Sequence, residues 1–125
     1  MKNVLIVLGL ALMTLACSGA NTVNPTPTTH SYNITCESSN YASSSSSPVH
    51  VTWSTSTGLS GTIQCTFAAS GLTSNISLQS TDVINITVSG NSFGFSNIYE
   101  RPAVGPSTAV ATVTYPNTSG YVVPY

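Results

Sequence analysis

Apolar and polar residues alternate with a period of two along most of the chain from Ser31 onward. Such a period places the apolar side chains of a segment on one face, as in a half-buried β-strand. No segment has the 3.6-residue period of a helix, and β-branched residues are abundant, which favours strands. The alternating apolar residues are Tyr32, Ile34 and Cys36; Val49, Val51 and Trp53; Ile63, Cys65 and Phe67; Ile76 and Leu78; Ile84, Ile86 and Val88; Phe93 and Phe95; and Ala109, Ala111, Val113 and Tyr115.

Segments rich in Gly, Pro, Ser and Asn separate these runs and are typical of turns. Residues 121–125 are expected to form the last strand, which Pro124 would confine to a sheet edge. About seven or eight short strands at such intervals are typical of a sandwich or a small barrel. The sequence therefore predicts an all-β fold, a small antiparallel β-sandwich.

Cys36 and Cys65 both fall on the apolar phase of their strands, so their side chains are expected to enter the same core. The sequence therefore predicts a disulfide between them, and closing a loop of about 29 residues stabilises a fold by roughly 3–4 kcal/mol. Trp53 lies between the two cysteines, also on the apolar phase. The Cys–Trp–Cys order resembles that of an immunoglobulin domain, although the cysteines there are about twice as far apart. The likeness concerns the sandwich architecture alone.

The first residues have the layout of a secretory signal: one lysine, an apolar run of about half a membrane-spanning length, and then small residues. Cys17 follows this run directly, in a segment that resembles the lipobox of bacterial lipoproteins, although Thr14 stands where that motif usually has Leu. The resemblance implies a signal peptide over residues 1–16 and a diacylated Cys17. Ordinary cleavage after Ala20 is the alternative. Residues 17–30 are expected to form a flexible tether, and residues 31–125 the β-sandwich domain.

Charged residues are rare, at 4% of the chain. Without Lys2 of the signal, one arginine stands against three acids, for a net charge of −2. A nucleic-acid-binding protein neutralises phosphates with several Lys and Arg side chains. Nucleic acid is therefore excluded as a partner.

No catalytic residue, metal ligand or cofactor is predicted. Two cysteines and two histidines at irregular spacings do not make a zinc site. His50 has the solvent-facing phase, and Asp82 opens a strand, where a carboxylate commonly caps a turn. Glu100 and Arg101 are expected to form an exposed pair, which contributes little. We therefore expect a protein that is not an enzyme.

These features lead to the hypothesis of a non-catalytic bacterial cell-envelope or secreted protein that acts by surface contacts. Its partners would be the membrane, through the lipid on Cys17, and protein or glycan. An outer-membrane or cell-surface lipoprotein is favoured, with a periplasmic or extracellular location as the alternative. Two other functions stay open: a pilin-like subunit of a surface fibre and a small secreted hydrolase. The tyrosines near loops are candidate contact residues, since tyrosine stacks on sugars or protein partners. They are Tyr41, Tyr99, Tyr115, Tyr121 and Tyr125.

Overall fold

The computed structural model describes residues 24–39 and 48–125, and this part of the chain contains nine β-strands and no helix. The predicted all-β fold is confirmed. The strand beyond the seven or eight that the sequence predicts is a two-residue segment that begins at Gly71, where the sequence indicates a turn. The strands are β1 (Thr29–Ser38), β2 (Val49–Thr55), β3 (Ser60–Cys65), β4 (Gly71–Leu72), β5 (Ile76–Gln79), β6 (Val83–Ser89), β7 (Gly94–Glu100), β8 (Thr108–Thr114) and β9 (Thr118–Val122).

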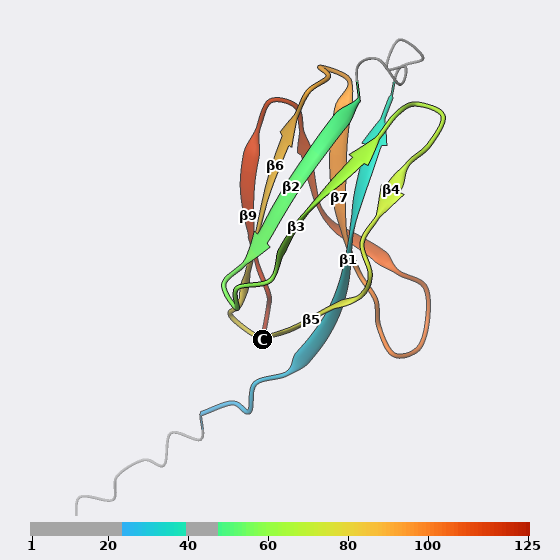
Figure 1. The fold of residues 1–125 in the computed structure, drawn as a ribbon. Coiled ribbons are helices and arrows are strands. Elements are labelled where there is room, and N and C mark those ends of the chain that lie inside the picture. The colour runs from blue at the N-terminus through green and yellow to red at the C-terminus, as the bar shows by residue number, and fades with distance from the viewer. Residues whose placement is uncertain (1–23, 40–47) are drawn as a thin grey trace, which may run out of the picture.

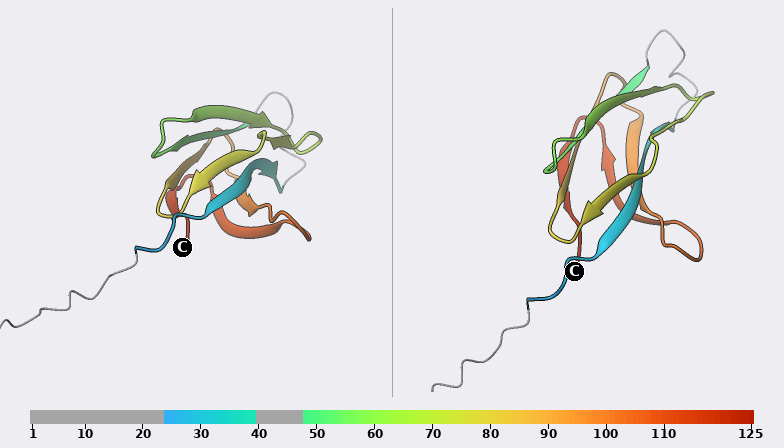
Figure 2. Two further views of the ribbon diagram at one scale, coloured as in Figure 1. Left: turned by 90° about the horizontal axis from the view of Figure 1, so that it is seen from below. Right: turned by 60° about the horizontal axis from the view of Figure 1, so that its bottom comes forward.

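The strands form two antiparallel sheets packed face to face as a sandwich (Figure 1). One sheet has the order β4-β1-β7-β8, with β5 also paired to β1, and the other has the order β3-β2-β6-β9. Along one side of β1, the first half pairs with β5 and the second half with β4. Views from below show the two layers and place the C-terminus beside the start of β1 (Figure 2). Both ends of the domain therefore lie at the same end of the sandwich.

The apolar residues of the alternating pattern form most of the core of the sandwich. In β5 and β6 buried residues alternate with exposed ones, because successive side chains of a strand point to opposite faces. The buried apolar residues are Tyr32, Ile34, Cys36, Val49, Val51, Cys65, Ile76, Leu78, Ile84, Ile86, Val88, Ile98, Val113 and Val123.

Cys36 and Cys65 form the predicted disulfide, with Cα atoms 5.7 Å apart. Cys36 lies in β1 and Cys65 ends β3, so the bond joins the two sheets through the core. Both residues are buried. A buried disulfide is compatible with an oxidising, exported location.

The phase predicted around Phe93 and Phe95 is wrong. The residues of β7 that face the core are Gly94, Ser96 and Ile98, whereas Phe93 is 41% exposed. The closeness of Val49 explains why residue 94 is a glycine, since a Cβ at position 94 would lie 2.5 Å from Val49 Cγ1. The core therefore accepts only a small residue at this point of β7.

Two other predicted positions differ at the ends of strands. Phe67 is 42% exposed rather than inward, because β3 ends at Cys65 and the chain turns there. The last strand is Thr118–Val122 rather than residues 121–125, and Pro124 lies beyond it. A cis peptide bond precedes Pro116 in the turn that leads into β9.

Candidate functional site

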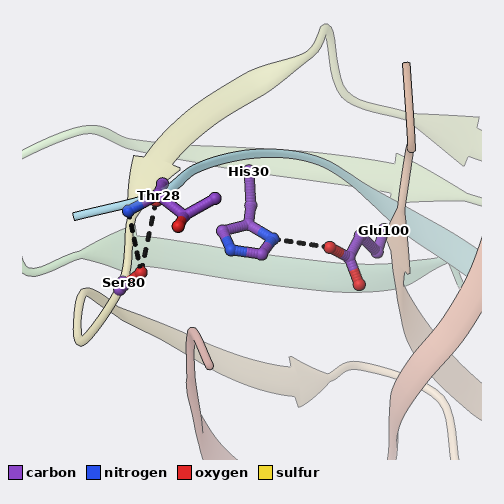
Figure 3. A network of polar contacts seen from close by, with 4 residues as sticks. All are labelled: Thr28, His30, Ser80 and Glu100. Atoms are coloured by element: carbon purple, nitrogen blue, oxygen red, sulfur yellow. Dashed lines mark hydrogen bonds and ion pairs between the residues drawn. The ribbon is translucent and has the colours of Figure 1, made fainter. Parts of the chain in front are cut away.

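The sequence predicts one site outside the domain, the lipidation of Cys17, and this residue lies outside the described part of the chain. His30, expected in the tether, instead belongs to β1. Its Nδ1 lies 2.6 Å from Oε1 of Glu100 (Figure 3). Just before β1, the Thr28 backbone N–H donates to Ser80 Oγ over 3.1 Å. These contacts attach the beginning of the domain to β7 and to the turn after β5.

The expected pair between Glu100 and Arg101 is not formed. Neighbouring residues of an extended chain point to opposite sides, so Glu100 reaches His30 while Arg101 Nη1 donates to Asn33 Oδ1 over 3.1 Å. A histidine held by a carboxylate is also the arrangement of a general base. Here, however, the second ring nitrogen of His30, Nε2, is buried and has no hydrogen-bond partner among the described residues. A substrate does not reach Nε2 in this conformation, so the pair serves to join β1 and β7.

Two tyrosines pack beside this pair. The rings of His30 and Tyr32 stack with centroids 6.2 Å apart, and Tyr121 meets Tyr32 edge-on at 5.7 Å. Burial raises the pKa of Tyr32 well above its ordinary value of 10.0, and the neighbouring Tyr121 and Glu100 add to this effect. Tyr121, a candidate contact residue in the sequence, is therefore used for packing.

His50 and Asp82 lie at opposite ends of β2. His50 is its second residue, whereas Asp82 Oδ1 accepts a hydrogen bond from Ser56 Oγ just after the strand ends. Asp82 Oδ2 also accepts one from the Gln79 backbone N–H over 2.8 Å, so the predicted turn-capping role is confirmed. The structure therefore keeps His50 and Asp82 apart.

Within residues 24–39 and 48–125, no three His, Cys, Asp or Glu side chains are grouped so that they could hold a metal ion. The same residues contain no helix of the length and hydropathy needed to cross a membrane.

The sequence does not predict the groove between the two sheets, a hollow of about 640 Å³ at their edges. We call it the edge groove. Among the described strands, β3 pairs with β2 alone and β4 and β5 pair with β1 alone, and the groove lies beside all three. None of the residues that line it is charged. They are Trp53, Leu59, Ser60, Gly61, Thr62, Ile63, Leu72, Thr73, Ser74, Asn75, Ile76 and Ser77.

Trp53 supplies the aromatic wall of the edge groove. Its neighbour across β2 and β3 is Gly61, and a Cβ on Gly61 would lie 3.0 Å from the indole. The indole therefore lies directly over the glycine and remains partly exposed. Leu59 and Leu72, at 48% and 61% exposure, extend the apolar surface.

The opposite wall is held in place by a buried amide. Asn33 of β1 is 4% exposed, and its Nδ2 donates to Thr73 O and to Asn75 Oδ1, both over 3.0 Å. The Ile34 backbone N–H donates to Thr73 Oγ1 over the same distance. This wall is therefore ordered by hydrogen bonds before any ligand arrives.

The position of Trp53 on an inward phase is the one sequence signal that points to this site. The contribution of Gly61 is hidden among the turn signals, and the segment from Leu72 to Ser77 has no pattern that places it opposite Trp53. No family model, curated protein or solved structure matches the chain.

Proposed function

We propose that this chain is a non-catalytic, exported binding protein of the bacterial cell envelope that acts through the edge groove. A lipid on Cys17 would anchor it to the outer membrane or cell surface. Cleavage after Ala20 would instead release the domain to the periplasm or the medium.

The observation that carries this proposal is the edge groove itself. Trp53, Leu59 and Leu72 leave apolar surface exposed together there, and a contiguous apolar patch with polar neighbours often marks an interaction site. Concave sites with apolar walls and a few fixed polar groups are the usual form of ligand sites. Binding therefore accounts for the groove better than packing does.

Two considerations support export, and one argues against catalysis. The signal-like N-terminus and the Cys36–Cys65 disulfide both suit a protein that leaves the cytoplasm. Catalysis needs an accessible acid, base or nucleophile. The His30–Glu100 pair instead has its second ring nitrogen buried. A small hydrolase is accordingly the weaker alternative.

A pilin-like fibre subunit is the other alternative. Such a subunit completes its fold with a strand from its neighbour. Each of the nine strands in the described part of this chain pairs within the same chain, which argues for a self-sufficient domain.

Binding to the envelope tests the proposed function. The mature domain, labelled with a fluorophore, is added to cells of the organism that encodes it and scored by flow cytometry. We expect saturable binding that Leu72→Ser reduces at least tenfold. Val104→Ser is the matched control, because Val104 is an exposed apolar residue, at 90%, that does not line the groove. Equal binding by the two variants would overturn the proposal.

Mass spectrometry of the native protein tests the anchor separately. The expected mature N-terminus is a diacylated Cys17. An N-terminus at Asn21 would refute lipidation and leave the released form.

A further inference from the structure

We propose that the edge groove binds a neutral oligosaccharide of two or three sugar units. This inference rests on the proposed binding function and names the class of ligand. Three features of the groove support it. Its lining is uncharged, an aromatic wall faces a wall with hydroxyl and amide groups, and only a short length of β3 is open.

The lining of the groove excludes ionised ligands. A carboxylate or phosphate that loses water on binding needs a cationic partner, and none of the twelve lining residues is charged. Arg101 is engaged elsewhere, because its Nη1 donates to the buried Asn33 Oδ1. The ligand is therefore uncharged.

The two walls offer different contacts to such a ligand. On one side lie the partly exposed indole of Trp53 and the aliphatic side chains of Leu59 and Ile63. On the other side lie Thr73, Ser74, Asn75 and Ser77, which carry hydroxyl or amide groups, and Asn33 Nδ2 holds the Thr73 carbonyl and the Asn75 side chain in place. A sugar ring has an apolar C–H face that packs on an aromatic ring, and it has hydroxyls around its edge. The groove matches both features.

The length of the open edge separates this ligand from a peptide strand. Near the end of β3, Gly71 approaches so closely that a Cβ there would lie 3.2 Å from Gln64 O and would collide with Ile63 Cγ2. The edge is therefore open only beside Ser60 to Ile63, which corresponds to about 13 Å of extended chain. An added strand usually runs for five or six residues and would not fit this opening. Two or three sugar rings would.

Fluorescence titration tests the proposal directly, because Trp53 is the only tryptophan of the chain. The probes are maltotriose, cellotriose and triacetylchitotriose, with trigalacturonic acid as the charged comparison. A capped heptapeptide of alternating Val and Thr represents a strand ligand. We expect a saturable change in Trp53 emission with at least one neutral trisaccharide and none with the charged one. Saturation by none of the three, equal saturation by the charged trisaccharide, or saturation by the peptide alone would overturn the inference.

Variants then locate the site by calorimetry, which needs no fluorophore. We expect Trp53→Phe to weaken binding about fivefold and Leu72→Ser about tenfold, and Val104→Ser to leave it unchanged. Thermal melts of each variant confirm folding. If the trisaccharides fail while Leu72→Ser still abolishes binding to cells, the ligand class is wrong and the binding function stands. If Leu72→Ser changes neither the binding of the trisaccharides nor the binding to cells, the ligand class and the binding function are both wrong.

Discussion

Cys36 and Cys65 join an interior strand of one sheet to the edge strand of the other, with Cα atoms 5.7 Å apart. Among the strands that the structure describes, β2 is the only one that pairs with β3. The disulfide therefore ties the end of the strand that borders the edge groove to the other sheet.

Replacing both cysteines by alanine is expected to lower the free energy of unfolding by about 3–4 kcal/mol, because the unfolded chain regains the entropy of a 29-residue loop. Urea unfolding followed by Trp53 emission measures this loss. A reducing agent should destabilise the wild type by a similar amount and leave the double variant unchanged. A loss below about 1 kcal/mol would contradict the role given to the bond.

Gly94→Ala is expected to destabilise the domain by about 1–3 kcal/mol through overpacking. The new methyl group would lie 2.5 Å and 2.8 Å from the two methyl carbons of Val49 in the core. Gly120→Ala is the matched control, because its nearest neighbour would be the side-chain oxygen of Asn85, which can move. Equal thermal midpoints for the two variants would show that the contact with Val49 is not tight.

Tyr32→Phe is expected to make the domain more resistant to alkali. Burial raises the pKa of Tyr32 in the folded state, so above pH 10 the unfolded chain loses a proton that the folded chain retains. The unfolded state then binds fewer protons, and stability falls as the pH rises, by about 1 kcal/mol at pH 11. The Tyr32→Phe variant should not show this loss of stability, because it has no phenol to ionise.

Urea unfolding at pH 8 and pH 11 measures the difference. Tyr125→Phe serves as the control, because Tyr125 is 76% exposed and has no comparable buried environment. If Tyr32→Phe and Tyr125→Phe lose the same stability between the two pH values, the explanation fails.

Asn33→Leu is expected to cost about 1–3 kcal/mol, since it removes the hydrogen bonds that the buried Asn33 amide makes to Thr73, Asn75 and Arg101. It should also speed amide exchange at Thr73, whose N–H donates to Ile34 O beside the lost contact. Asn85→Leu, on the exposed face of β6, is the control for hydrophobicity. Unchanged exchange at Thr73 would mean that Asn33 does not order the groove wall.

The sequence predicts strands such as β5 and β6 well because they have one buried and one exposed face, which produces the period of two. Cys36 and Cys65 could be paired for the same reason, since both share the inward phase. Around Phe93 the pattern fails, because the core positions of β7 are held by the small Gly94, which packs tightly against Val49, and by the polar Ser96. A pattern of apolar residues does not identify core positions that are occupied by small or polar residues.

The candidate site could not be predicted, because its parts are joined only by strand pairing. Trp53 lies in β2 and Asn75 in the segment between β4 and β5, and no local pattern states that the two line the same groove. His30 and Glu100 are likewise 70 residues apart in sequence, so their contact is visible only in the fold.

The pairing of β1 also sets the order in which the domain can form. Its residue Tyr32 aligns with Ile76 on one side and with Glu100 on the other, so neither neighbour of β1 is the next strand in the chain. Contacts between such distant residues slow folding, since a long loop must close before they form. If the chain is exported as proposed and emerges N-terminus first, β4 and β5 would become available to pair with β1 before β7 does. The pairing of β1, the first strand in the chain, is therefore complete only after β7 has been made available.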